Sequence, residues 1–251
     1  MTQEACLEPT TEATRSPELA RPLVWHLPTR LFHWALVVMI AFQWISYTYA
    51  EAMGDSLLKW HRWNGIAVLV LIVWRVLWGI AGPDRARFVM FVRGPGRSIR
   101  YANDMIAGRA SLYLGHNPLG AWMVVALLAA VAAQAGMGLF TVEHNDLTAG
   151  PLYRLVSEPT QKMLSRWHAS AFYYVVLVLV AIHVLANLYH VLVKKEPLVQ
   201  AMISGRKPAG DYEDALAARQ MTRPNLVAAL LLIAACAIVL GGIKLAGGRF
   251  I

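Results

Sequence analysis

The stretch RWHASAFYYVVLVLVAIHVLANLYHVLVKK, residues 166–195, decides the fold class of this chain. Its apolar run is long enough to cross a bilayer as one helix, yet it carries His168, His183 and His190. Ionisable side chains inside a membrane span are costly, and they persist mainly where they face the protein interior and bind something. The stretch therefore predicts a transmembrane helix whose histidines have a function.

The spacing of His168 and His183 indicates what that function is. The 15 residues between them correspond on a helix to a rise of about 22 Å and to roughly 60° off a whole number of turns. We therefore expect the two imidazoles near opposite leaflets and on broadly the same face of the helix. One helix that offers an axial ligand to each of two stacked haems needs this arrangement. The alternative is a helix whose three histidines hydrogen bond only to backbone or water.

The composition places the whole chain in the membrane class. Of its 251 residues, 57% are hydrophobic and only 15% are charged, whereas soluble domains have about 25% charged residues. The net charge of +8 does not predict a nucleic-acid partner, because the basic residues lie in short segments between apolar runs, where they set membrane orientation. With Cys6 and Cys236 as the only cysteines, thiolate ligation of an iron–sulfur cluster is excluded.

Apolar runs suggest five membrane spans. They lie at roughly 31–50, 60–81, 119–140, within the opening stretch, and at 225–243. Lys and Arg are concentrated in the tail before the first run, in the link 82–118 and in the segment 194–224. Because such residues favour the cytoplasmic side, we expect a cytoplasmic N-terminus and an external C-terminus. The fifth run contains no histidine and is expected to be a peripheral span.

This topology sorts the histidines by depth. His33 opens a span that starts inside, and His61 opens one that starts outside. The fourth span starts outside, so that His168 lies in the outer leaflet and His183 in the inner one. The four residues thus form two pairs at matching depths, His61 with His168 and His33 with His183. We expect each pair to hold one b haem through its two imidazoles.

Cationic side chains near these histidines are candidates for binding the anionic haem propionates. Arg30, Arg62 and Arg166 are next to or near ligand candidates, and ordinary juxtamembrane charge is an equally good explanation for these three. Arg75 is more suggestive because it lies within an apolar run. His190, seven residues after His183, is the runner-up for the inner ligand. His116 is expected to cap a helix or to border a quinone or a propionate.

Several motifs in this order resemble the bacterial cytochrome b561 family, which includes the membrane cytochrome b subunits of nickel–iron hydrogenases. The motifs are RLFHW at 30–34, WRVLWGIAGPDRARF at 74–88, GHNPLGAWM at 115–123, the His168…His183 span and EPLVQAMISGRK at 196–207. They cover roughly residues 24–208. The resemblance implies an all-α integral membrane protein with a four-helix transmembrane bundle that holds two b haems, with His33, His61, His168 and His183 as axial ligands.

The residues and the resemblance together set the expected domains, and the chain departs from the family at one point. Residues 1–22 are expected to form a flexible cytoplasmic tail, 23–208 the di-haem core, 209–224 a cytoplasmic linker, and 225–251 an additional transmembrane helix with a short tail. The family usually spaces its two fourth-helix histidines one residue closer than the 15 residues of this chain. A helical bulge or a change of register would accommodate the extra residue.

The favoured function is a di-haem cytochrome b of the bacterial inner membrane that links the quinone pool to a periplasmic redox protein. That protein would be a c-type cytochrome or a hydrogenase-like subunit, and a bound quinone is a further candidate cofactor. One alternative is a stand-alone quinone-coupled oxidoreductase such as a superoxide oxidase, in which Lys162 or Arg166 steers an anion. Another is a haem-free transporter or structural membrane protein, in which the histidines relay protons or form hydrogen bonds.

Overall fold

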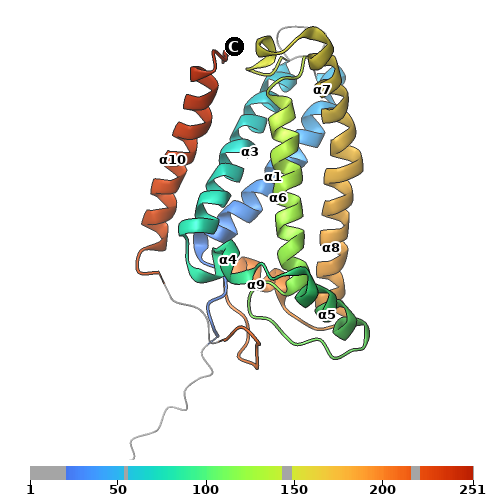
Figure 1. The fold of residues 1–251 in the computed structure, drawn as a ribbon, viewed down its shortest axis with the longest axis vertical. Coiled ribbons are helices and arrows are strands. Elements are labelled where there is room, and N and C mark those ends of the chain that lie inside the picture. Colours follow the sequence, from blue (N-terminus) through green and yellow to red (C-terminus); the bar gives the residue numbers. More distant parts are fainter. Residues whose placement is uncertain (1–20, 54–55, 143–148, 216–220, 251) are drawn as a thin grey trace, which may run out of the picture.

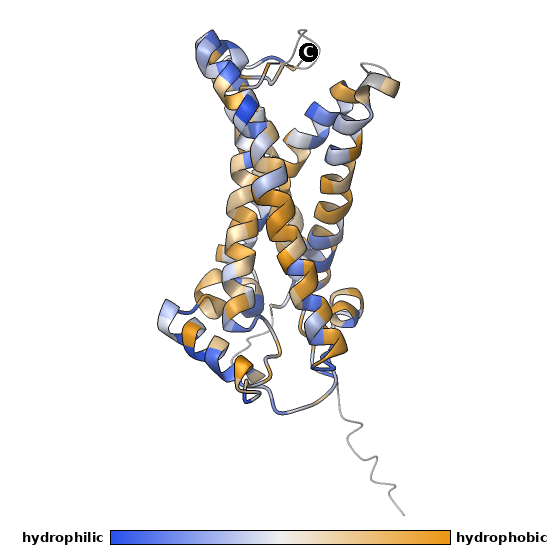
Figure 2. Ribbon diagram, turned by 90° about the vertical axis from the view of Figure 1, so that its right-hand side faces the viewer, coloured by the Kyte–Doolittle hydropathy of each residue, from blue (hydrophilic) through white to orange (hydrophobic). Residues whose placement is uncertain are grey.

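The computed structural model describes residues 21–53, 56–142, 149–215 and 221–250. These residues form an all-helical protein without a β-sheet, and five of its helices are long and apolar enough to cross a membrane. The long helices run side by side (Figure 1), and apolar residues dominate their middle portions whereas polar residues gather towards both ends (Figure 2). The predicted fold class, a helical membrane bundle, is confirmed.

Four long helical units make the bundle. They are α1 (Leu27–Thr48), α3 (Ser56–Ala81), α6 (Pro118–Gly138) and the continuous helix Glu158–Leu192. Proline near the first turn of α1 and of α6 suits a helix start, because its missing N–H would have no intrahelical partner there. The Asn117 side chain caps α6 by accepting a hydrogen bond from the Gly120 N–H at 2.8 Å, as N-cap residues do.

The continuous helix contains an irregular turn between its two histidines. It consists of α7 (Glu158–Ala171), the π-helical segment η3 (Phe172–Val176) and α8 (Leu177–Leu192). A π-bulge takes up one extra residue within an α-helix, so the 15 residues from His168 to His183 rotate the helix as about 14 would. Fourteen steps end about 40° from four full turns, closer than the roughly 60° left by fifteen. The bulge is therefore how the chain accommodates its longer spacing.

The fifth span, α10 (Pro224–Leu245), packs against α3 outside the four-helix bundle (Figure 1). Its buried residues Ala228, Ala235, Val239 and Ile243 join a cluster that includes Trp74 and Trp78. Small residues at such a contact let two membrane helices approach closely. The Trp74 indole N–H also donates to the Ala228 carbonyl at 2.9 Å, in a buried hydrogen bond. The peripheral position expected for this span is confirmed.

We call the end of the bundle that carries α7 the upper end and the end that carries α9 the lower end, as drawn in Figure 1. The upper end also has the short helix α2 (Ala50–Met53) and a 3-10 turn, η2 (Tyr153–Leu155). The lower end has the short elements η1 (Asp84–Ala86), α4 (Phe88–Phe91) and α9 (Leu198–Ser204), together with α5 (Pro95–Ile106). In α5, Ser98 and Tyr101 are buried and Ile99 and Ile106 are exposed, as expected for a helix at the membrane surface.

The segment after α9 is bound to the lower end of the bundle. Asp214 forms an ion pair with Arg85 at 3.2 Å and accepts hydrogen bonds from the N–H groups of Leu114 and Gly115. Lys207 is buried, its ammonium group donates to the Tyr113 carbonyl at 2.7 Å, and burial lowers its pKa. The first part of the predicted linker 209–224 is thus fixed to the bundle. The predicted tail lies, apart from Arg21 and Pro22, outside the described residues.

Candidate functional site

Four histidines from three helical units meet as two pairs inside the bundle. His61 of α3 and His168 of α7 form the upper pair, with ring centres 6.3 Å apart. His33 of α1 and His183 of α8 form the lower pair, with ring centres 6.4 Å apart. The structure brings together the same partners that the depth argument paired. One continuous helix contributes one histidine to each pair.

These separations fit a metal atom between the two imidazoles of each pair. A metal–imidazole bond of about 2.0–2.1 Å on each side, plus about 1.1 Å from each nitrogen to its ring centre, places the two centres roughly 6–6.5 Å apart. Histidines in direct contact would lie closer, and unrelated ones could lie anywhere. Both pairs therefore have the spacing of two axial ligands to one metal atom, although their contacts differ.

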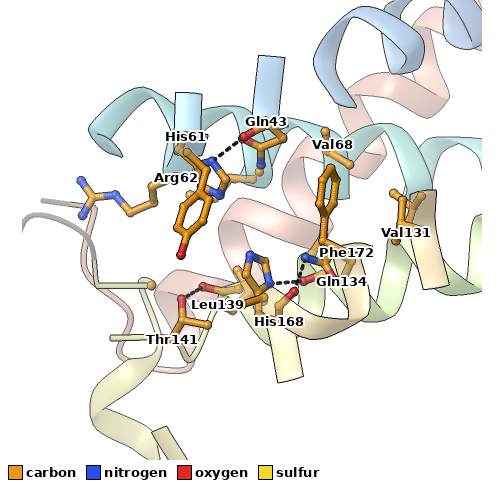
Figure 3. Close-up of a pocket in the computed structure, with 18 of the residues that line it drawn as sticks. Gln43, His61, Arg62, Val68, Val131, Gln134, Leu139, Thr141, His168 and Phe172 are labelled. Carbon is orange, nitrogen blue, oxygen red and sulfur yellow. Dashed lines mark hydrogen bonds between the residues drawn. The ribbon is translucent and has the colours of Figure 1, made fainter. Parts of the chain in front are cut away.

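Backbone carbonyls orient both rings of the upper pair (Figure 3). The Nδ1 atom of His61 lies 3.1 Å from the Gln43 carbonyl and 3.1 Å from the Ser46 hydroxyl, and Nδ1 of His168 lies 2.9 Å from the Gln134 carbonyl. A neutral imidazole carries one N–H, and a carbonyl can only accept. Nδ1 must therefore hold the proton, which leaves the lone pair of Nε2 free to bind a metal.

A pocket surrounds the upper pair. It encloses about 1200 Å³ of space not filled by atoms, part of it open to the surroundings, and its lining includes His61, His168 and Arg62. The remaining wall is largely apolar, with Ile66, Val68, Val131 and Val176 among the buried members. An apolar chamber with two facing imidazoles and a cation at its edge suits a flat, largely apolar macrocycle with anionic substituents.

Gly138, the last residue of α6, lies directly against the His168 ring. A Cβ atom at this position would be 3.1 Å from Cε1 of that ring, so a larger side chain must displace the imidazole. If the upper pair binds a haem, as the sequence predicts, Gly138→Val should lower the haem content by about half, since displacing a ligand weakens metal binding. Haem content per polypeptide and the reduced-minus-oxidised spectrum measure the effect.

Gly136 provides the matched control for this change. It belongs to the same helix, and a Cβ atom there would meet no described atom within 4 Å. Gly136→Val should therefore leave the haem content unchanged. Equal losses in the two variants would mean that valine disturbs α6 itself, and that the contact between Gly138 and His168 is not what matters for haem binding.

The lower pair has a less complete set of partners. The Nδ1 atom of His33 is buried and has no hydrogen-bond partner among the described residues. The Asn187 amide, one turn after His183, lies 3.3 Å from Nε2 of His183 and donates to the His183 carbonyl at 2.7 Å. Metal binding through Nε2 would replace the longer of these two contacts and leave the shorter one in place. The lower pair fits an axial-ligand role through its spacing more than through its hydrogen bonds.

The two upper arginines proposed as propionate partners are placed differently. Arg62 lines the upper pocket, and its guanidinium donates to the Ala149 carbonyl at 3.4 Å. Arg166 is exposed and is not among the residues that line this pocket. Lys162, which the superoxide alternative used for steering, forms an ion pair with Glu158 at 2.6 Å. Arg62 is therefore the cation of these three that the fold brings to the upper pair.

The two lower arginines both approach the lower-end segments. Arg30 lies one turn before His33, and its guanidinium donates to the Ile203 carbonyl while its Nε atom is buried without a partner in the described part of the chain. Arg75 is buried, donates to the Ala86 carbonyl at 3.2 Å and lies over the Phe88 ring at 4.8 Å. Arg75 thus holds the segment that leads from α3 to α4.

Two of the remaining histidines, His190 and His116, have local partners. His190 is buried and pairs with Glu196 at 3.0 Å through Nδ1, so the fold places His183 rather than His190 beside His33. The His116 ring lies between Trp25 and Phe91, with centroid distances of 4.7 and 4.6 Å, and burial lowers its pKa. The helix cap considered for His116 is formed instead by its neighbour Asn117.

Sequence reasoning did not single out the residues that orient the ligands. These are Ser46, which contacts His61, Gln134, whose backbone and side chain both contact the His168 residue, and Asn187, which contacts His183. Each is a polar residue in an otherwise apolar span. That feature was visible in the sequence, because polar groups inside a span usually have a partner. Which histidine each one serves depends on how the helices pack.

The comparisons with known proteins agree with this architecture. A family model described as prokaryotic cytochrome b561 matches residues 24–205, which is more than half of the chain. The curated proteins and the solved structures gave no significant match. The matched residues include all four paired histidines and end before α10. The chain therefore belongs to the prokaryotic cytochrome b561 family and is a multi-pass membrane b-type cytochrome of electron transfer.

Proposed function

We propose that the chain is a di-haem cytochrome that carries electrons across the bacterial inner membrane. His61 and His168 are the axial ligands of an upper haem, and His33 and His183 are those of a lower haem. The observation that carries this proposal is the metal-compatible spacing of two histidine pairs, 6.3 and 6.4 Å between ring centres, at opposite ends of one helical bundle. A single site would need only one such pair.

Haem iron with two protein ligands exchanges single electrons and has no open position for oxygen. The protein's own part is to hold the rings neutral and correctly turned. The carbonyls of Gln43 and Gln134 fix the Nδ1 protons of the upper pair. Arg62 at the upper pocket and Arg30 beside His33 are the cations that we assign to the propionates, with Arg75 as a further candidate at the lower end.

We assign the two ends of the bundle to the two sides of the membrane and the upper end to a protein partner. The lower end is the cytoplasmic one, because the links gathered there contain Arg93, Arg97, Arg100, Arg109, Lys194 and Lys195, and such residues favour the cytoplasmic side. The upper end then faces the periplasm, where a c-type cytochrome or a hydrogenase-like subunit exchanges electrons with the upper haem. Quinone dissolved in the membrane is the other partner. The N-terminus is cytoplasmic in this assignment, and the C-terminus is periplasmic.

A haem count on the purified protein tests this proposal. We expect two b haems per polypeptide, both with the sharp reduced bands of low-spin, six-coordinate iron. A single haem would contradict the two-site proposal, and a protein that binds none under conditions where it is folded would contradict the electron-transfer function. Co-purification with a haem-c protein or with a hydrogenase-like subunit would identify the periplasmic partner.

A further inference from the structure

The chain that follows α10 turns back towards the bundle at the upper end. At Gly247 the backbone is left-handed, with φ of +81°. The N–H of Gly247 donates to the Lys244 carbonyl at 3.0 Å, and that of Gly248 donates to the Ile243 carbonyl at 2.8 Å. These two bonds form a Schellman motif, which ends a helix and reverses the chain direction, and which favours glycine at the left-handed position. The sequence Ala246–Gly247–Gly248 suits this turn.

Gly248 ends the turn, and the residues Gly248–Phe250 contact the bundle. We call these three residues the C-terminal clasp. Gly248 packs so closely on Leu152 that a Cβ atom would lie 2.8 Å from its Cδ2. The Arg249 N–H donates to the Pro151 carbonyl at 3.1 Å. The Phe250 ring stacks on the Trp63 ring, with centroids 5.7 Å apart and planes at 17°. Each residue of the clasp thus makes its own contact with the upper end of the bundle.

The clasp contacts the segment Ala149–Leu152, which we call the wall segment because Gly150 and Pro151 line the upper pocket. The wall segment lies on the end of α6. The Gly150 N–H donates to the Thr141 carbonyl and the Leu152 N–H to the Leu139 carbonyl, both at 2.8 Å. This is also the end of α6 at which Gly138 touches the His168 ring.

The wall segment also touches the other side of the upper pair. The Ala149 carbonyl accepts a hydrogen bond from Arg62, which follows His61 in α3. The next residue of α3, Trp63, stacks with the Phe250 ring of the clasp. Ala149 is only 3% exposed and Leu152 8% exposed, although the segment is not part of a long helix. Connections without regular structure open easily unless other parts of the chain hold them down. In this protein the residues that follow α10 add their contacts to the hydrogen bonds from the end of α6 and from Arg62.

We propose that α10 and the clasp are positioning elements of the upper haem site, which keep the wall segment seated on α6 and exclude water and small solutes from the pocket. α10 is anchored along α3 by the Trp74–Ala228 hydrogen bond and the buried cluster around it. The position of the clasp at the upper end is therefore fixed by the packing of α10 on α3. This inference rests on the proposed function in one respect, that the upper pocket holds a haem.

The first test needs no haem. In a protein with Cys6→Ser and Cys236→Ala, the change Ala149→Cys places a single thiol at a buried position of the wall segment, and its rate of labelling by a polar maleimide reports opening. Phe250→Ala removes the ring stack, and Gly247→Ala places a side chain at a left-handed position. We expect Phe250→Ala to label about two- to tenfold faster, the range that an aromatic pair contributes. Gly247→Ala should also label faster, because an L side chain at a left-handed position weakens the turn. Leu245→Ala, which is 91% exposed at the same end of α10, should label at the unmodified rate.

The second test follows haem transfer from the intact protein to apomyoglobin. The upper haem is identified as the one missing from both His61→Ala and His168→Ala. In Phe250→Ala this haem should leave about two- to tenfold faster, and in Gly247→Ala it should also leave faster, while the lower haem leaves at the unmodified rate in both. If the labelling rate and the rate of haem transfer are both unchanged in these variants, the proposal for the clasp is wrong. It is also wrong if labelling is faster but both haems leave faster to the same extent. If His61→Ala and His168→Ala lose different haems, the ligand assignment fails instead, and the labelling result still decides whether the clasp holds the wall segment.

Discussion

Replacing either His61 or His168 with alanine is expected to remove the same haem and to leave the other one in place. The two rings face each other at 6.3 Å between centres, so each variant loses one of the two ligands of a single iron. Haem content should fall from about two to about one per polypeptide, because a b haem is held by its axial ligands and its apolar surround without a covalent bond. The remaining haem should keep its low-spin spectrum in both variants.

The lower pair gives the complementary result. His33→Ala and His183→Ala should each remove the haem that the upper variants retain. At the upper site, the double variant His61→Ala, His168→Ala should lose no more haem than either single variant. His190→Ala is the control, since His190 pairs with Glu196 and lies outside both pairs. A haem lost from His190→Ala but kept in His183→Ala would move the lower ligand two turns along α8.

Deleting Tyr174 is expected to leave both haems bound, whereas inserting one alanine after it should remove one of them. Tyr174 lies in the π-segment and is 78% exposed, so that its side chain contributes little to the interior. Without it the segment can close as a regular α-helix, and the 14 residues between the histidines preserve their relative rotation. An inserted residue instead turns His183 by about 100° relative to His168.

The pair of variants separates register from general damage. Both change the same position by one residue, and only the insertion alters the angle between the two ligands. Haem content and the temperature of haem loss measure the outcome. A deletion that loses as much haem as the insertion would show that the π-segment itself, and not the register it restores, supports the sites.

Much of this architecture could be read from the sequence. Five apolar runs predicted five spans because hydropathy is a local property that tertiary packing does not change. The pairing of His33 with His183 and of His61 with His168 followed from depth alone, since span direction alternates and each helix rises by a fixed length per residue. The family motifs added the b-type cytochrome identity, which the family match confirmed.

The tertiary structure decided what surrounds the ligands. The acceptors that hold the Nδ1 protons are the backbone carbonyls of Gln43 and Gln134, and every residue has such a carbonyl, so no sequence pattern marks the ones that are used. Arg62 reaches the upper pocket and Arg166 does not, a difference that their places beside His61 and near His168 in the sequence do not specify. The sequence offered a bulge and a change of register as equal solutions, and the packed helix contains the bulge.

The same division applies to the fifth helix. Its length and apolarity predicted a membrane span, and its lack of histidine indicated a peripheral position. Its contact with α3 and the return of Gly248–Phe250 to the wall segment join residues that are about 100 to 190 positions apart in the chain. Contacts between distant residues depend on the combined geometry of all the helices, which local hydropathy and spacing do not specify. The sequence alone therefore determined the spans and the histidine pairs, and tertiary packing determined how their sites are oriented and enclosed.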